Sequence, residues 1–188
     1  MTKYYTDLMF DAETFSVNSN AGMISIGAVL FNVAKGIEDR QEFKMNINLQ
    51  EIIDNPRFHV SSSTLAWWIT QNSKAFEAAT TCPHPLYNVL FDFNEWLRAY
   101  TRPGKYEKQD VRIWSNGAGS DLPWLRNAYE TLKLDTPWLF YNERCYRTVK
   151  AMSQVQMQRV NDHDALSDAR NQAHHLCEIF ATEGFEIW

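Results

Sequence analysis

Residues 5–14 read YTDLMFDAET, and this stretch predicts the centre of the fold. Residues 5–10 are the expected strand, and its final apolar run at residues 8–10 is typical of a central strand that is covered on both faces. Asp11 and Glu13 follow the run, and residues two apart on a strand point to the same side. Open α/β sheets hold their ligands at the ends of such strands. We therefore expect the carboxylates of Asp11 and Glu13 to face one metal site at the edge of a sheet.

The rest of the chain predicts a layered α/β fold. Three early strands, followed by alternating helices and short strands, are typical of this class. The chain has 188 residues and no internal repeat, so we expect residues 1–188 to form a single domain. The other expected strands are residues 23–31, 42–47, 111–114 and a short segment at 139–140. One expected helix has Ser62 or Ser63 as its N-cap and runs through Trp67 and Trp68. The other expected helices are residues 86–100, 121–132, 144–152 and 165–182.

A further acidic residue, Asp121, follows a glycine-containing turn at residues 116–119. Ser-Asp is a preferred pair at the start of a helix, so Asp121 also has a structural explanation. The turn follows a predicted strand, which brings the start of the next helix to the sheet end that carries Asp11. The two roles are compatible, because an Asp in the first turn of a helix can face a metal.

The last part of the chain contributes His163 and Asp168, which are five residues apart. Five residues at about 100° each place them roughly 140° apart on a helix, so they cannot share one helical face. We therefore expect His163 on the loop before the last helix, Asp164 at its N-cap and Asp168 one turn inside it. An exposed His163 and a solvated Asp168 are the structural alternative.

Composition limits the classes of protein that the chain can represent. It is 45% apolar and 22% charged, which is ordinary for a folded globular protein. The longest apolar stretch, residues 21–34, is too short to span a bilayer, and the first residues do not resemble a secretory signal. The three cysteines are scattered, which predicts reduced thiols and a cytoplasmic location.

The net charge of −5 argues at first against a nucleic-acid partner. Four carboxylates account for −4 of it, and two bound Mg²⁺ ions would bring the total to −5 + 4 = −1. Two divalent cations need several converging carboxylates, and phosphodiester hydrolysis needs a base beside them. Asp11, Glu13, Asp121 and Asp168 are the predicted metal ligands, and His163 is the predicted base.

These motifs, taken in order, resemble the DEDD-type 3′–5′ exonucleases of the histidine subclass (DEDDh) in the ribonuclease H-like superfamily. Residues 10–14 (FDAET) resemble the first motif, 116–121 (NGAGSD) the second and 163–169 (HDALSDA) the third. A finer resemblance, to the subgroup of phage exodeoxyribonuclease A and the mycobacterial exoribonuclease-like proteins, rests on residues 64–71 and 144–148. Ser120 departs from the pattern, because many relatives carry an aromatic residue there.

The resemblance implies a three-layer αβα fold around a mixed five-stranded sheet. It implies hydrolysis of single-stranded RNA or DNA from the 3′ end to nucleoside 5′-monophosphates, with two Mg²⁺ or Mn²⁺ ions per site. It also implies a possible homodimer. The choice between RNA and DNA depends on contacts to the 2′-OH, which residue identity does not settle.

Several residues are candidates for contact with the substrate. Trp67 and Trp68 could stack on unpaired bases, although neighbours on a helix point about 100° apart, so only one would face a cleft. Arg144, Arg147 and the basic loop at residues 102–108 could contact phosphates. The motifs add Thr14 and Asn116 to this set.

Two other functions remain open from the sequence. A metal-dependent endonuclease of the same superfamily would use similar carboxylates, although His163 favours the exonuclease. A non-catalytic nucleic-acid-binding or adaptor domain could keep the fold without the chemistry. All five candidate catalytic positions carry competent residue types, which argues against the adaptor.

Overall fold

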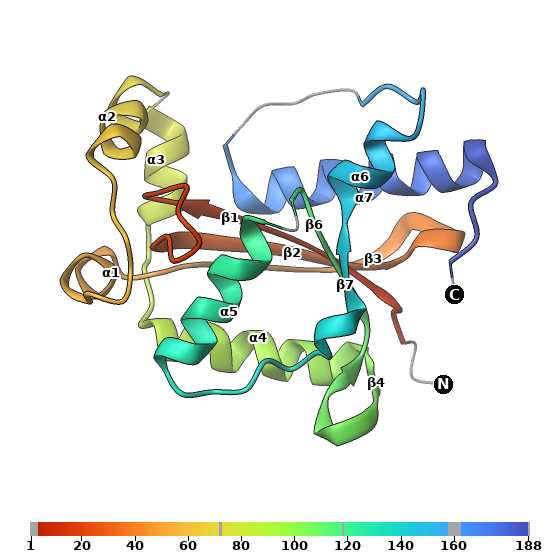
Figure 1. Cartoon of the computed structure of the whole chain (residues 1–188), viewed down its shortest axis with the longest axis horizontal. Coiled ribbons are helices and arrows are strands. Elements are labelled where there is room, and N and C mark those ends of the chain that lie inside the picture. Colours follow the sequence, from red (N-terminus) through yellow and green to blue (C-terminus); the bar gives the residue numbers. More distant parts are fainter. Residues whose placement is uncertain (1–3, 72, 118, 158–162, 188) are drawn as a thin grey trace.

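The computed structural model describes residues 4–71, 73–117, 119–157 and 163–187. Its centre is a five-stranded sheet in the order β3-β2-β1-β6-β7 (Figure 1). The first three strands pair antiparallel, and β6 and β7 run parallel to β1, so the sheet is mixed, as predicted. The strands are β1 (Asp7–Thr14), β2 (Met23–Asn32), β3 (Gly36–Asn46), β6 (Arg112–Ser115) and β7 (Glu143–Cys145).

Helices cover both faces of the sheet and give the predicted α/β layers (Figure 1). Leu8 and Phe10 of β1 pack with the apolar sides of α4 (Leu86–Tyr100) and α5 (Asp121–Thr131). Met9 points to the opposite face and packs against α7 (Ala165–Glu183). This alternation follows from the two-residue period of a strand. Asp11 and Glu13 continue the Met9 series, so they point to the α7 side.

The peripheral elements fill the ends of the sheet. Buried residues of α2 and α3 form a separate apolar cluster with Phe15 and Ile24, beyond the end of β1. The remaining helices are α1 (Leu49–Asp54), α2 (Ser62–Thr70), α3 (Ser73–Thr80) and α6 (Tyr146–Ala151). The 3₁₀ turns are η1 (Val33–Lys35), η2 (Lys105–Glu107) and η3 (Phe140–Asn142), and β4 (Arg102–Pro103) pairs with β5 (Gln109–Asp110).

Three details differ from the expected elements. β1 does not end before Asp11, because pairing with β2 continues through Glu13. The last strand lies at Glu143–Cys145, whereas the expected segment contains a 3₁₀ turn with an exposed Phe140. Helices α1 and α3 were not expected, and both are short. β7 is only three residues long and is defined by its pairing with β6, and α1 and α3 are only six and eight residues long. Elements this short leave little periodic signal in a sequence.

Candidate metal centre

The site begins on β1, where Asp11 and Glu13 are 8% and 9% exposed. Asp11 pairs with Gly27 of β2, and Glu13 pairs with Ser25. On the other side, β6 stops opposite Phe10, so the last part of β1 has a free edge there. Both carboxylates therefore lie at the carboxyl end of a central strand, where open sheets hold ligands.

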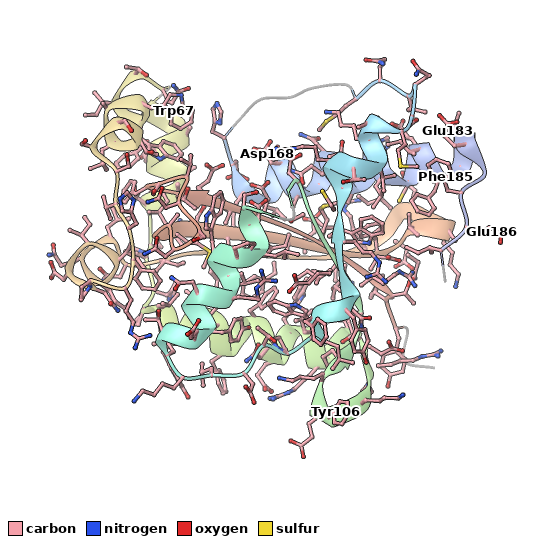
Figure 2. The ribbon with its side chains drawn as sticks, in the orientation of Figure 1. Trp67, Tyr106, Asp168, Glu183, Phe185 and Glu186 are labelled. Carbon is pink, nitrogen blue, oxygen red and sulfur yellow. The ribbon has the colours of Figure 1, made fainter. Side chains whose placement is uncertain are left out.

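Asp168 reaches this pair from the first turn of α7 (Figure 2). Ligand oxygens of Asp11, Glu13 and Asp168 all lie within 4.8 Å of one another. Asp164 is the N-cap of α7 and accepts a hydrogen bond from the Ser167 backbone N–H at 2.9 Å. The structure therefore brings the predicted third motif to the first, with Asp164 and Asp168 in the expected positions on the helix.

The close approach of α7 to the sheet depends on Gly27. A Cβ atom at this position would lie 2.2 Å from the carbonyl carbon of Ala165 and 2.2 Å from the backbone nitrogen of Leu166. Since both atoms belong to the backbone at the start of α7, no side-chain rotation could relieve the overlap. The missing side chain of Gly27 sets the distance between Asp168 and the β1 carboxylates.

Gly27→Ala is accordingly expected to displace the start of α7, with an overpacking cost of about 1–3 kcal/mol. We expect a lower melting temperature and a weaker affinity for divalent cations, measured by thermal melts with and without Mg²⁺. Gly119→Ala is the matched control, because nothing lies within 4 Å of its Cβ position. Equal melting behaviour of the two variants would contradict the assignment.

Asp121 joins the site as the first residue of α5 and is 5% exposed. It is not part of the group of three formed by Asp11, Glu13 and Asp168, but its charge raises the pKa of both Asp11 and Glu13. The Ser120 hydroxyl donates to its carboxylate at 3.1 Å, and the nearby backbone N–H groups of Ala12 and Gly117 lower its pKa. The turn before α5 thus delivers Asp121 to the free edge of β1. Ala118 of this turn lies outside the described residues.

The electrostatics of the site show a cluster of acids that repel one another. Burial raises the pKa of Glu13 to about 8, and the charges of Asp168, Asp164 and Asp121 add to this effect. Burial also raises the pKa of Asp11 well above its usual value and that of Asp121 to about 6. Asp7, buried on the same face, instead has an ion pair with Arg112 at 2.8 Å. Among the described residues, neither Asp11 nor Glu13 has such a pair.

This donor set fits divalent cations. Carboxylate oxygens are the ligands that Mg²⁺ and Mn²⁺ prefer, and an ion would supply the positive charge that the cluster lacks. Two buried polar atoms at the same place have no hydrogen-bond partner among the described residues, Ser25 Oγ beside Glu13 and Gln172 Oε1 beside Asp11. Asp11, Glu13, Asp121 and Asp168 are thus chemically suited to hold Mg²⁺ or Mn²⁺.

The raised pKa values predict how pH and metal affect stability. Below about pH 4, folded and unfolded chains hold the same protons on Glu13 and Asp121. At higher pH the unfolded chain releases them first, so the folded state loses stability as the pH rises through about 6 and then about 8. We expect the melting temperature in EDTA to fall from pH 5 to pH 8, and Mg²⁺ to restore it most at pH 8. Glu13→Gln should flatten this dependence, and an unchanged melting temperature with Mg²⁺ at pH 8 would argue against a metal centre.

His163 precedes the N-cap of α7 and has a backbone φ of 47°, in the left-handed region. This conformation is uncommon for residues other than Gly, although Asn, Asp and His adopt it more often than the rest. The His163 ring lies edge-to-face with the Trp67 ring of α2, with 4.9 Å between their centroids. His163 and Trp67 therefore meet across two segments that are almost a hundred residues apart, at the start of the helix that carries Asp168.

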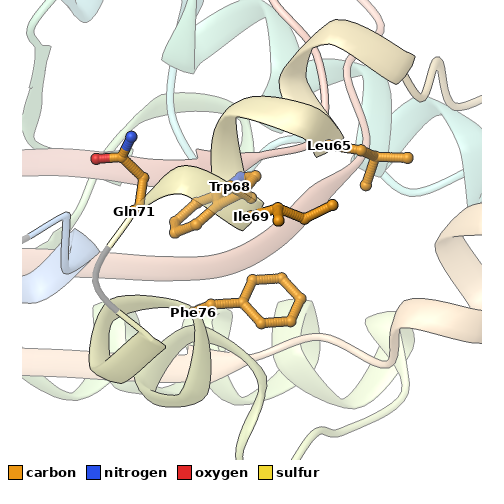
Figure 3. Close-up of a pocket in the computed structure, with 5 residues that line it drawn as sticks. All are labelled: Leu65, Trp68, Ile69, Gln71 and Phe76. Carbon is orange, nitrogen blue, oxygen red and sulfur yellow. The ribbon is translucent and has the colours of Figure 1, made fainter.

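The two tryptophans of α2 have different environments. Trp67 is 40% exposed, whereas Trp68 is 3% exposed. The Trp68 indole packs against Phe76 and donates a hydrogen bond to the Thr14 carbonyl at 3.0 Å. The prediction of substrate contact is therefore wrong for Trp68, because the helix turns its ring inward. Trp68 instead forms one wall of a pocket of about 490 Å³ between α2 and α3 (Figure 3), with Leu65, Ile69, Gln71 and Phe76.

Of the other residues predicted to contact substrate, three lie near the acidic cluster and Arg144 bonds to its own neighbours in the chain. Arg147 lies beside the turn to Asp121, because its guanidinium carbon is 3.6 Å from the Cβ position of Gly117. Asn116 follows the end of β6, and Thr14 ends β1, so both lie at the sheet edge of the site. The Arg144 guanidinium instead donates to the carbonyls of Tyr141 and Glu143, which come just before it in the chain.

The basic loop at residues 102–108 lies at the opposite end of the sheet. Thr101, just before it, pairs with Tyr5 ahead of β1, whereas Asp11 and Glu13 lie toward the other end of that strand. The Lys108 ammonium donates to the Thr136 carbonyl. The structure therefore places this loop away from the carboxylates, at the end of the sheet where β1 begins.

Two residues that contact the acidic cluster were not predicted from the sequence. Lys44 of β3 pairs with Asp164, and its charge lowers the pKa of Glu13. Gln172 of α7 donates from Nε2 to Asp11 Oδ1 at 2.8 Å. Gln172 is one helical turn after Asp168, so its spacing was a usable signal. Lys44 and Asp164 are 120 residues apart in the sequence, so no local pattern could predict their contact.

Comparison with known families agrees with this geometry. Residues 6–180 match the sequence model of a family described as the 3′-5′ exoribonuclease Rv2179c-like domain. No curated protein matches the chain. Among the described residues, none of the helices combines the length and the apolar character that crossing a membrane requires.

Solved structures share the fold at low sequence identity. The nuclease domain of 3′hExo, a DEDDh family member bound to rAMP, has a TM-score of 0.63 at 15% identity and covers 100% of this chain and 98% of its own. S. pombe Pop2p, in a form with Mg²⁺ and Mn²⁺, has a TM-score of 0.57 at 14% identity, and the match covers 95% of this chain and 84% of Pop2p. The RNase domain of yeast Pop2 has a TM-score of 0.56 at 12% identity, and the match covers 95% of this chain and 78% of the Pop2 chain. The chain thus has the ribonuclease H-like fold of DEDDh nucleases.

Proposed function

Because the chain belongs to the Rv2179c-like 3′–5′ exoribonuclease family, we propose that this 3′–5′ exonuclease degrades single-stranded RNA to nucleoside 5′-monophosphates in a reaction that needs two divalent cations. The observation that carries the proposal is the convergence of Asp11, Glu13 and Asp168 within 4.8 Å, with Asp121 adjacent. These residues come from β1, α5 and α7. Burial raises the pKa of Asp11, Glu13 and Asp121, so this cluster is costly to ionise without a cation.

The carboxylates of this chain would hold Mg²⁺ or Mn²⁺, and the ions would neutralise the scissile phosphate and activate the attacking water. S. pombe Pop2p, which shares the fold, was solved with both metals. The Asp121 carboxylate accepts a hydrogen bond from the Ser120 hydroxyl at the start of α5. Asp168 keeps its place through the close contact of α7 with Gly27.

His163 would act as the general base. It stands on the loop that leads into α7, five residues before Asp168, and the Trp67 ring holds one side of its imidazole. A positioned base of this kind contributes about 10²- to 10⁴-fold to a hydrolytic rate. Its acceptor nitrogen would take the proton from the attacking water as the water oxygen bonds to phosphorus. The bond from phosphorus to the 3′ oxygen of the remaining strand would break, and that oxygen would take up a proton to leave as a 3′-OH.

The substrate would reach the site past Trp67 and Arg147. Trp67 is exposed enough to stack on an unpaired base, and Arg147 is exposed beside the Gly117 turn, where it could meet a phosphate. RNA is favoured by the family description and by the rAMP bound to the fold relative 3′hExo. A net charge of −5 favours weak contact without sequence preference.

Trp67→Ala is expected to raise the KM for a single-stranded oligonucleotide by about 5- to 150-fold, because base stacking on an aromatic ring contributes about 1–3 kcal/mol. Steady-state rates on an unstructured oligoribonucleotide measure this. Trp67→Phe keeps an aromatic ring and should stay much closer to the wild type. A KM unchanged in Trp67→Ala would remove Trp67 from the substrate path.

The test of the proposal uses matched single-stranded RNA and DNA labelled at the 5′ end. With Mg²⁺ or Mn²⁺, we expect a ladder that shortens from the 3′ end, faster on RNA, and no ladder in EDTA. Cleavage of a circular single strand would instead indicate an endonuclease. Binding of RNA without cleavage, by folded protein with either metal, would favour a non-catalytic domain.

A further inference from the structure

Gln172 occupies an unusual position for an amide side chain. It is 5% exposed, lies on the face of α7 that packs on the sheet, and follows Asp168 by one helical turn. Its Nε2 donates to Oδ1 of Asp11 at 2.8 Å. The neighbouring buried residues of the helix, Ala169 and Ala173, are small and apolar. A polar side chain therefore lies between two small apolar residues of α7, where this helix faces Asp11.

The two ends of the Gln172 amide are used differently. Nε2 is hydrogen-bonded to the carboxylate, whereas Oε1 is buried and has no partner among the described residues. Ser25 Oγ, on the strand position that pairs with Glu13, is a second buried polar atom without a described partner. Buried polar atoms are normally satisfied, so unpaired ones beside acids point to a ligand or water that completes the site.

We propose that Gln172 is a positioning residue for the metal centre: by donating to Oδ1 it fixes the Asp11 carboxylate so that Oδ2 faces the cation site. This inference rests on the proposed function. An amide suits the task because it donates a hydrogen bond and stays neutral, so it adds no charge to a cluster that is already acidic. Its Oε1 remains available to accept a hydrogen bond from a water in the site.

Residues that orient metal ligands typically change metal affinity or activity by 10- to 100-fold when they are replaced. Gln172→Met keeps the approximate length and volume but removes the donor. We expect its Mn²⁺ affinity, measured on the full chain by the loss of the free-Mn²⁺ EPR signal, to weaken by 10- to 100-fold. Its melting temperature without metal should stay within a few degrees of the wild type.

Cys177→Ala is the matched control, because Cys177 is also buried on α7 but packs with Phe180 and Trp114 in the apolar cluster away from the carboxylates. It should keep the wild-type Mn²⁺ affinity even if it melts earlier. Gln172→Asn, which retains the amide but is one methylene shorter, should lose Mn²⁺ affinity like Gln172→Met. It also serves as the test variant if Gln172→Met does not fold.

The outcomes separate the two proposals. Wild-type protein that binds Mn²⁺, together with folded Gln172 variants that bind it within about threefold as tightly, would overturn the positioning role alone. Wild-type protein that binds no Mn²⁺ at millimolar concentration would overturn the proposed metal centre itself. Weakened binding in both Gln172 variants, with unchanged binding in Cys177→Ala, would establish the role.

Discussion

Asp168→Asn is expected to reduce the exonuclease rate by at least about 10³-fold, because a metal ion contributes several kcal/mol to the stabilisation of the transition state. Asn has nearly the size of Asp and keeps one oxygen, but it lacks the negative charge that binds a cation. Asp168 is the one member of the group of three that α7 supplies. Single-turnover cleavage of 5′-labelled RNA with saturating Mg²⁺ measures the effect.

The same variant gives a second readout that a purely structural role would not produce. Removing one charge relieves repulsion on Glu13, whose pKa is raised partly by Asp168. The metal-free variant should therefore melt at or above the wild-type temperature at pH 8 and gain less from Mg²⁺. Asp92→Asn, on the exposed side of α4, is the matched control. A variant that keeps more than a tenth of the wild-type rate would exclude Asp168 as a ligand.

The sequence was most informative where chemistry and local pattern coincide. Asp11 and Glu13 were expected on one side of a strand, Asp121 at a helix start and Asp168 one turn into another helix, and the structure has each residue there. These positions follow from periods of two and of 3.6 residues, which can be read over a few residues. The mixed five-stranded sheet came from the family resemblance and agrees with the observed order.

The sequence was least informative where distant segments determine local structure. β1 extends past Asp11 because β2 pairs with it, and α2 turns Trp68 inward because Phe15, Ile24 and α3 form a cluster there. Both effects depend on neighbours that are far away in the chain. Arg144 is a different case, because its partners are the carbonyls of Tyr141 and Glu143, which lie within three residues of it in the chain.

The carboxylates of the site repel one another, and nearby positive charges and helix dipoles offset part of this repulsion. Asp121 is the first residue of α5 and Asp168 lies in the first turn of α7, so each carboxylate sits near the positive end of a helix dipole. Backbone N–H groups also lower the pKa of Asp121, and Lys44 lowers that of Glu13. Burial still outweighs these effects and raises the pKa of both acids. The fold therefore keeps a cluster that a divalent cation would stabilise further.

His163→Ala is expected to reduce turnover by about 10²- to 10⁴-fold, while metal and substrate binding persist. The reason is that His163 is the predicted base and not a predicted ligand, so its loss removes proton transfer but no metal contact. Pre-steady-state cleavage of RNA measures the chemical step, and Mn²⁺ titration measures binding. Trp67 packs on the His163 ring, so the variant also opens space beside Trp67.

The backbone at His163 supplies the sharper comparison. With φ at 47°, the position suits Asn better than Ala, because Asn adopts the left-handed region more readily. His163→Asn should therefore fold at least as well as His163→Ala and yet be equally slow, since an amide cannot accept the proton at neutral pH. Added imidazole should restore part of the rate in His163→Ala, where the ring has been removed. If His163→Asn or His163→Ala kept the wild-type rate, the proton would have to leave by another group, and the acidic cluster alone would account for the chemistry.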